Sequence, residues 1–301
     1  MDILEGTVIA VHGSLIRVQA GDRLLVVSAR RRLRWEGGTP ESARLVVGDR
    51  VAVEMHGAED GVVQTVHARS SALTRKAPHG NRPQVLAANV DQALVVFATV
   101  APEPKPRTLD RFLIGCEAAS IQPVIVINKV DRGTESVDGW IDFYAALGYP
   151  VLMVSARSGW GMGQIKRLLP ERTTLFCGPS GVGKSSLLNA VYPGFRLTVG
   201  TVSEATGKGR HTTTRAELLP LPFGGFVVDT PGLKEFGVWN LERIEIEVAM
   251  PEIHRAAAGC RFPNCTHDHE PDCAVQAAVE AGEILPSRYQ SYLTLLEEVV
   301  P

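Results

Sequence analysis

The stretch that decides the fold is Gly178-Pro179-Ser180-Gly181-Val182-Gly183-Lys184-Ser185-Ser186, whose first eight residues fit the phosphate-loop pattern G-x-x-x-x-G-K-[ST] at every position. The apolar run 173–177 before it predicts a strand, and residues 185–191 after it predict the opening of a helix. In that context backbone N–H groups turn inward around phosphates, favoured by the dipole of the helix N-terminus. We therefore expect Lys184 to reach the β- and γ-phosphates of a nucleotide and the Ser185 hydroxyl to bind Mg²⁺.

A second motif, Asn128-Lys129-Val130-Asp131, distinguishes guanine from adenine. The Asp131 carboxylate can accept hydrogen bonds from the guanine N1–H and 2-amino groups, a donor pair that adenine lacks, so adenine would leave the carboxylate unpaired. We expect the Lys129 stem to cover the base plane, and Ser155-Ala156, which follows the apolar run 151–154, to supply a backbone N–H to guanine O6. Together with the phosphate loop, these motifs predict binding of GTP and GDP.

The third motif, Asp229-Thr230-Pro231-Gly232, follows the apolar residues 226–228. We expect Asp229 to hold Mg²⁺ through water and the Gly232 N–H to meet the γ-phosphate. The polar, Thr-rich segment 207–214 has the character of a switch loop, in which Thr212 or Thr213 would reach Mg²⁺; we take Thr213. A surface loop with no ligand role is the alternative for this segment.

The group that activates water is less obvious, because Leu233 stands where many GTPases have a water-orienting glutamine. Leucine cannot polarise water. His211, inside the switch-like segment, is the best internal candidate for the catalytic residue, and a surface histidine without a role is the alternative. A partner could also supply the group.

The motifs stand in a permuted order, since the base-reading residues 128–131 and 155–156 precede the phosphate loop. An ordinary small GTPase begins with the phosphate loop. We therefore predict a circularly permuted α/β P-loop G domain over residues 84–240, with alternating strands and helices around a parallel sheet. Because of the permutation, the segment 229–232 continues into the C-terminal part of the chain. A shift of this segment that depends on the γ-phosphate could therefore reorient the C-terminal part.

Residues 1–75 contain short β-type runs separated by turn residues, which predict a small closed barrel. The OB-fold is the first interpretation, and an SH3-like barrel is the structural alternative. A basic cluster at 30–34 in an expected loop suits contacts to RNA phosphates, although a charge run can simply be a solvated face. Residues 75–83 have the polar, Pro- and Gly-containing composition of a linker. The expected strands are 6–11, 15–18, 23–27, 50–53 and 61–66.

Residues 241–301 carry a metal signal in Cys260, Cys265, His267 and Cys273, and they end in two amphipathic stretches, 274–281 and 286–299, that predict helices. A Cys₃His set is typical of a closed, structural, tetrahedral Zn²⁺ site. The spacing C-x₄-C-x-H-x₅-C is not that of the common zinc fingers, and His269 is a competing ligand. Unliganded cysteines in a reduced loop are the alternative. We expect the two other cysteines, Cys116 and Cys177, to be ordinary buried residues.

Composition excludes several classes of protein. The 301 residues have 45% hydrophobic and 21% charged residues and a net charge of −2, as in a soluble globular protein without a global basic field. No apolar stretch approaches the ~20 residues of a membrane span, and the N-terminus lacks the features of a signal peptide. Five cysteines without an export signal argue against a disulfide framework. We expect a cytoplasmic monomer.

The motifs resemble those of the bacterial RsgA (YjeQ/YloQ) family of small-subunit-dependent GTPases. The resemblance rests on the permuted order, on residues 178–186, on Gly209-Arg-His-Thr-Thr-Thr214, and on the Cys-Arg-Phe-x-x-Cys-x-His stretch with its later Glu-Pro-x-Cys. It implies an OB-fold, a permuted GTPase and late maturation of the 30S subunit with its 16S rRNA, with hydrolysis stimulated by that particle. It also carries the zinc ligands to Cys260, Cys265, His267 and Cys273 and the catalytic histidine to His211. Arg157 and Asp272 depart from the frequent Lys and Gly of the family.

Two other functions remain compatible with the motifs. One is a nucleotide-gated RNA-binding scaffold in which hydrolysis only resets binding. The other is a metabolic P-loop enzyme such as a kinase, which the guanine motifs and the lack of a second substrate signature disfavour.

Overall fold

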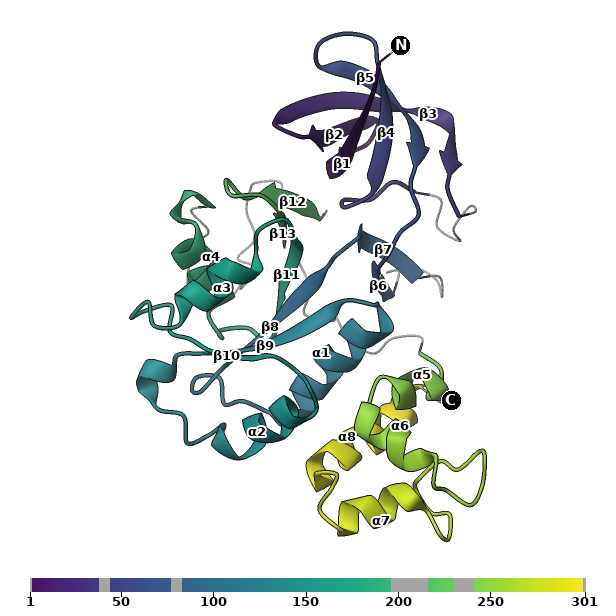
Figure 1. Ribbon diagram of the computed structural model, residues 1–301, viewed down its shortest axis with the longest axis vertical. Helices are drawn as coiled ribbons and strands as arrows, with labels where there is room; N and C mark the ends of the chain where they lie inside the picture. Colours follow the sequence, from purple (N-terminus) through teal and green to yellow (C-terminus); the bar gives the residue numbers. More distant parts are fainter. Residues whose placement is uncertain (1, 38–43, 77–82, 196–215, 230–240, 300–301) are drawn as a thin grey trace, which may run out of the picture.

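The computed structural model describes residues 2–37, 44–76, 83–195, 216–229 and 241–299. Figure 1 shows an N-terminal barrel, a central sheet flanked by helices, and a C-terminal group of helices that lies beside α1 (Pro106–Ala118). No helix among these residues combines the length and apolar character needed to cross a membrane.

The barrel closes in the strand order β1-β2-β3-β5-β4, with β1 also paired to β4. This is the arrangement of a five-stranded Greek-key barrel, and the OB-fold expectation is confirmed. Alternate residues such as Val18, Leu25 and Val53 point inward into a core that excludes water. The strands are β1 (Ile3–His12), β2 (Leu15–Ala20), β3 (Arg23–Trp35), β4 (Arg50–Met55) and β5 (Asp60–Val66).

The basic cluster 30–34 lies in β3 and not in a loop, which corrects the sequence interpretation. β3 pairs with β2 over its first half and continues along β5, with a register shift between Ala29 and Arg34. Leu33 is half-buried against the barrel core, whereas Arg32 and Arg34 are exposed. Inward-facing and outward-facing side chains therefore alternate as in other strands, but the run of arginines hides this alternation in the sequence.

The predicted linker is also shorter than its composition indicates. Arg75, Lys76 and Pro83 belong to the antiparallel pair β6 (Ala72–Lys76) and β7 (Pro83–Ala88). The remaining residues of that stretch lie outside the described part of the chain. Paired strands on both sides of the stretch connect the barrel to the central sheet.

The central sheet has the order β10-β9-β8-β11-β13-β12 among the described residues. β10, β9, β8, β11 and β13 are mutually parallel, as predicted, whereas β12 is an antiparallel edge strand that the sequence analysis did not predict. All carboxyl ends of the parallel strands meet at one edge of the sheet, so the chain order of the motifs does not affect their meeting place. The strands are β8 (Gln92–Ala98), β9 (Gln122–Asn128), β10 (Val151–Met153), β11 (Thr173–Cys177), β12 (Glu217–Pro220) and β13 (Phe226–Asp229).

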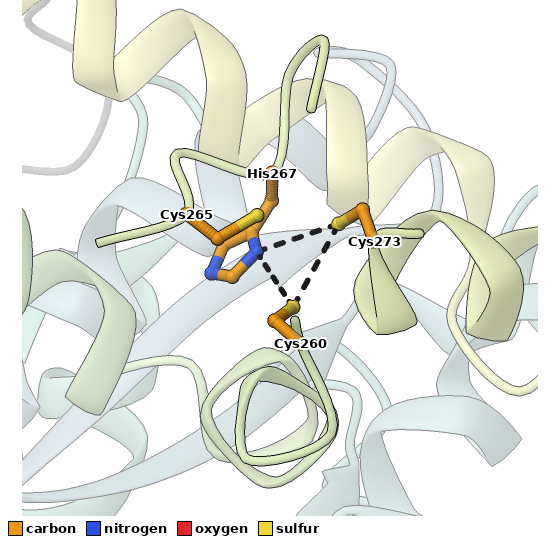
Figure 2. Close-up of side chains that lie close together, drawn as sticks. All are labelled: Cys260, Cys265, His267 and Cys273. Carbon is orange, nitrogen blue, oxygen red and sulfur yellow. Dashed lines mark hydrogen bonds between the residues drawn. The ribbon is translucent and has the colours of Figure 1, made fainter. Parts of the chain in front are cut away.

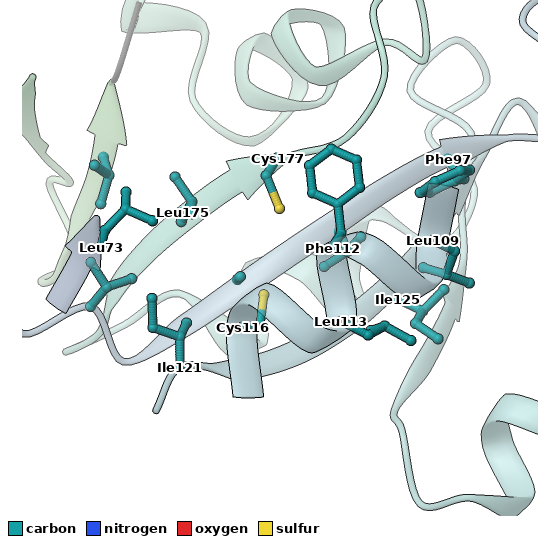
Figure 3. Close-up of a cluster of buried hydrophobic side chains, with 14 of the residues drawn as sticks. Leu73, Phe97, Leu109, Phe112, Leu113, Cys116, Ile121, Ile125, Leu175 and Cys177 are labelled. Carbon is teal, nitrogen blue, oxygen red and sulfur yellow. The ribbon is translucent and has the colours of Figure 1, made fainter. Parts of the chain in front are cut away.

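Each face of the sheet has its own core. On β8, Val95 and Phe97 pack with α1 (Pro106–Ala118) and α2 (Asp138–Ala146). The alternate residues Leu94 and Val96 pack with α3 (Met162–Leu168) and α4 (Lys184–Val191) on the other face. Figure 3 shows the first of these cores, in which Cys116 and Cys177 are buried as expected. Short 3₁₀ turns, η1 (Val130–Arg132) and η2 (Pro193–Phe195), follow β9 and α4.

The C-terminal part contains α5 (Arg243–Val248), α6 (Pro251–Ala257), α7 (Ala274–Glu280) and α8 (Pro286–Val299). The last two helices agree with the sequence prediction, whereas α5 and α6 were not predicted. These helices share a core with Ile114 of α1, so the C-terminal part packs directly on the central domain.

Buried charges reinforce this packing. Arg288 of α8 is fully buried and donates from Nη1 to Asp110 of α1 (2.6 Å) and from Nε to Glu252 of α6 (2.5 Å). Tyr144 of α2 donates to the same Asp110 oxygen, and the Arg288 guanidinium lies 5.6 Å from the Tyr144 ring centre. A shift that reoriented the C-terminal part would have to separate these charges, and an unpaired buried charge is costly.

We expect Arg288→Met to loosen the C-terminal helices by roughly 3–5 kcal/mol, because it leaves two buried carboxylates without their cation. Hydrogen exchange of α6 and α8 amides in the full chain should then accelerate by about two to four powers of ten, since ~1.4 kcal/mol is tenfold. The control is Arg111→Met, which removes an ion pair with Glu298 at the surface and should cost under ~1 kcal/mol. Equal protection in both variants would contradict the role of the buried cluster.

Candidate nucleotide site and metal centre

The phosphate loop joins β11 to α4. Gly178 and Gly183 have φ angles of +128° and +98°, and a Cβ on Gly178 would collide with the Val96 carbonyl oxygen of β8. Only glycine combines this backbone with so close an approach to the neighbouring strand. Pro179, Ser180, Gly181 and Val182 complete the loop, and Ser185 and Ser186 lie in the first turn of α4.

The Lys184 ammonium lies inside this loop. Its Nζ donates to the carbonyl oxygens of Gly178 (2.8 Å) and Pro179 (2.7 Å). Burial lowers the pKa of Lys184. The ammonium is therefore held in a poorly hydrated position, where a phosphate oxygen would gain more from it than in water.

Asn128, in the first base-reading motif, contacts both the phosphate loop and the second base-reading motif, Ser155-Ala156. It is buried at the end of β9, and its Nδ2 donates to the Val182 carbonyl of the phosphate loop (2.8 Å). Its Oδ1 accepts from the Ala156 N–H (3.1 Å), in the second base-reading motif. One side chain thus fixes the spacing between the base-reading motifs and the phosphate loop.

The Asp131 carboxylate is exposed and oriented by a neighbour. Its Oδ1 accepts from the buried Ser155 hydroxyl at 2.6 Å, and this hydrogen bond lowers the pKa of Asp131. Asp131 is therefore ionised at neutral pH and presents acceptor oxygens only. The Ser155-Ala156 pair is predicted to supply a backbone N–H to guanine O6. The Ala156 N–H is engaged by Asn128 Oδ1, so a base that used this donor would have to share it.

Lys129 bridges the base-reading motif and the phosphate loop. Its backbone is left-handed (φ +65°), which turns the chain from β9 into η1 at Val130. Its Nζ donates to the carbonyl oxygens of Ala101 (2.6 Å) and Gly181 (2.8 Å). The Lys129 side chain therefore reaches the phosphate loop, and its contact with the base plane stays a prediction.

Asp229 ends β13 opposite Glu217 of β12. Desolvation raises the pKa of the Asp229 carboxyl, and the Glu217 carboxylate adds to the shift. Glu217 also contacts the barrel, since its Oε1 lies 3.4 Å from His12 Nε2 of β1. Gly232, His211, Thr213, Thr212 and Leu233 lie outside the described residues, so their predicted roles remain predictions.

The candidate metal ligands converge in the C-terminal part (Figure 2). The ligand atoms of Cys260, Cys265, His267 and Cys273 all lie within 4.8 Å of one another. His267 Nδ1 lies 3.5 Å from the Sγ atoms of both Cys260 and Cys273, and those two Sγ atoms lie 3.9 Å apart.

These separations fit a tetrahedral Zn²⁺ site. Zn–S and Zn–N bonds of about 2.3 and 2.0–2.1 Å imply S···S and S···N separations of about 3.8 and 3.6 Å. Burial raises the pKa of the Cys265 thiol to about 12, so metal binding there has to displace a proton. The competing residue His269 is exposed beside Asp268 and does not belong to the cluster.

Two residues that the sequence analysis did not consider lie beside the cluster. Glu247 Oε2 lies 3.5 Å from His267 Nε2, and Arg243 donates from Nη1 to the Cys265 carbonyl oxygen at 2.5 Å. In the sequence, the one sign of this pair is an arginine and a glutamate four residues apart, shortly before Cys260. No known motif singles out that pair.

A cavity of about 790 Å³ lies between the barrel and the turn that joins β12 to β13. Arg50, His67, Glu171 and Phe226 are among its lining residues. None of the described nucleotide-motif residues lines this cavity, so the cavity does not coincide with the candidate nucleotide site.

Comparison with known proteins gives one consistent result. A model of the RsgA GTPase family matches residues 66–239, which include Asn128, Lys184 and Asp229. The small ribosomal subunit biogenesis GTPase RsgA of Gemmatimonas aurantiaca is 43% identical, with coverage of 98% of this chain and 97% of the relative. The protein of the same name from Moorella thermoacetica is 40% identical, with coverage of 99% and 98%.

Solved structures agree over the whole chain. YjeQ from Thermotoga maritima is 32% identical and superposes with a TM-score of 0.80, covering 99% of both chains. YloQ, described as a circularly permuted GTPase, is 31% identical with a TM-score of 0.78, covering 99% of this chain and 95% of YloQ.

Proposed function

The chain belongs to the RsgA GTPase family and is a GTP hydrolase, and from this premise we propose that it acts in the biogenesis of the small ribosomal subunit. The relatives that share its full length carry that role in their names. We propose late maturation of the 30S particle, with GTP hydrolysis stimulated by that particle. The functional units in this proposal are residues 1–75, 84–240 and 241–301.

The observation that carries the nucleotide assignment is the position of Asn128. Its amide group contacts the phosphate loop on one side and the Ser155-Ala156 motif on the other. Asp131 lies in η1, which follows β9 directly after Lys129, and its carboxylate is oriented by a hydrogen bond from the Ser155 hydroxyl. A guanine base bound there would have its phosphates over Lys184.

We expect Asp131→Asn to move base preference from guanine toward xanthine nucleotides. The amide replaces a pure acceptor by a group that can donate to the 2-oxo group of xanthine, while it loses an acceptor for the guanine 2-amino group. Titration calorimetry with GDP, XDP and ADP measures the shift in the variant and the guanine preference of the wild type. Equal wild-type affinities for ADP and GDP would refute the assignment.

We propose two kinds of metal ion. Mg²⁺ would be bound with GTP by the Ser185 hydroxyl, by Thr213 and, through water, by Asp229. One structural Zn²⁺ would be held by Cys260, Cys265, His267 and Cys273, and metal analysis of purified protein tests its stoichiometry. Zinc supplies folding energy to the loop that carries these ligands, because a site of this kind does not exist in the unfolded chain.

We propose that the barrel contacts 16S rRNA and that the protein is a cytoplasmic monomer. Arg32 and Arg34 are exposed on β3 and can contact phosphates, whereas Arg30 is engaged by Glu54 at 3.1 Å. The affinity for the small subunit should then fall as the salt concentration rises. This fall should be less steep for the variants Arg32→Ala and Arg34→Ala, which lose a phosphate contact. Unchanged binding of the double variant would count against this contact.

A further inference from the structure

The two ring nitrogens of His267 face different partners. Nδ1 points to the Sγ atoms of Cys260 and Cys273, both at 3.5 Å, as the dashed lines in Figure 2 show for this nitrogen. Nε2 is buried, makes no hydrogen bond among the described residues, and lies 3.5 Å from Glu247 Oε2, the carboxylate of a different element, α5. A neutral imidazole that binds a metal through Nδ1 carries its hydrogen on Nε2. That hydrogen would be directed at Glu247.

Glu247 is itself a buried carboxylate, 7% exposed, and it needs donors. Its Oε1 accepts from His254 Nδ1 at 3.1 Å, which leaves Oε2 for the ring of His267. The carboxylate thus has one oxygen for each histidine. His254 is not among the four clustered ligands, so the two histidines have different surroundings on either side of one carboxylate.

The same helix also holds the backbone of the metal loop. Arg243, four residues before Glu247 and therefore on the same face of α5, donates to the carbonyl oxygens of Cys265 (2.5 Å) and Asn264 (3.3 Å). A Zn²⁺ with three thiolates has a net charge of −1, and the Glu247 carboxylate adds another negative charge beside it. The Arg243 guanidinium offsets that charge at the point where the loop meets the helix.

We infer that Glu247 is a positioning residue of the metal centre. It accepts the Nε2–H of His267, selects Nδ1 as the metal-binding nitrogen, and together with Arg243 attaches the centre to α5. Carboxylates behind a ligating histidine fix the tautomer and the ring orientation. This inference rests on the zinc site proposed above, but it adds a residue outside the four ligands and a specific coordination mode.

The first test is the tautomer of His267 in the zinc-loaded, ¹⁵N-labelled full chain. Long-range ¹H–¹⁵N correlation spectra should show zinc on Nδ1 and a hydrogen on Nε2. Zinc on Nε2 would overturn the inference, and this result does not depend on any variant folding correctly. A wild-type chain without stoichiometric zinc would instead overturn the zinc proposal, and the inference with it.

The second test measures zinc affinity by competition with a chromophoric chelator. Glu247→Ala removes the acceptor and should weaken zinc binding 10–100-fold, the usual effect of losing such a partner. Glu247→Gln keeps a carbonyl oxygen for the Nε2–H and should recover most of the affinity. Glu297→Ala, an exposed carboxylate on α8, is the control and should bind zinc as the wild type does. Wild-type affinity in Glu247→Ala, or equal losses in the Ala and Gln variants, would overturn the role of Glu247 as an acceptor.

Discussion

Replacing Lys184 by alanine is expected to abolish GTP hydrolysis while the central sheet stays folded. The Lys184 ammonium lies inside the phosphate loop, held by two carbonyl oxygens in a partly buried position. Charge-assisted contacts to the β- and γ-phosphates from such a position stabilise charge that develops during phosphoryl transfer. Loss of one preorganised donor of this kind typically costs ~10²–10³-fold in rate, and a full ammonium should not cost less.

Turnover at saturating GTP measures this loss, and circular dichroism checks the fold. Lys184 contributes hydrogen bonds to its own loop and does not belong to any of the hydrophobic cores, so unfolding is not expected. The matched control is Lys166→Ala, an exposed lysine on α3, which should hydrolyse GTP normally. Normal turnover in Lys184→Ala would show that the phosphate loop is wrongly assigned.

The second large effect is expected for His211→Ala, measured with small ribosomal subunits present. Leu233 cannot orient water, so we propose that His211 orients the attacking water when the small subunit is bound. A positioned base or water-orienting group is typically worth ~10²–10⁴-fold. The variant should therefore lose most of the subunit-stimulated rate and keep its affinity for GTP.

The slow turnover of the free protein is the internal control for this variant. It should barely change, because we propose that His211 acts on the attacking water only when the subunit is bound. Full stimulated turnover in His211→Ala would make the histidine a bystander and assign the catalytic group to another residue or to the ribosome.

The local motifs could be predicted from the sequence because short-range chemistry determines them. The strand before the phosphate loop was predicted at 173–177, where β11 lies, since a β-type apolar run ends there at an obligatory glycine. The candidate metal ligands are spread over only fourteen residues, so their convergence follows from loop closure, and the structure brings together the predicted four. The nucleotide motifs lie close together because each follows a parallel strand, and the carboxyl ends of these strands share one edge of the sheet.

The remaining features depend on contacts that no local pattern contains. Asp110 and Arg288 are 178 residues apart, and neither residue looks buried in a sequence, because charged side chains are normally exposed. Glu247 and Arg243 read as charges on a solvated helix until α5 is placed beside the metal loop. The strand at 30–34 was missed because arginines on the outward face hid the inward alternation of Leu33 and Trp35.

The most direct test of the account is the GTP turnover of the full chain with and without purified small ribosomal subunits, with ATP as a parallel substrate. We predict slow hydrolysis of GTP alone, a substantial increase when subunits are added, and negligible hydrolysis of ATP in either case. A GTP rate that small subunits leave unchanged, while the protein still binds them, would contradict the proposed subunit-stimulated GTPase and favour a scaffold in which hydrolysis only resets binding.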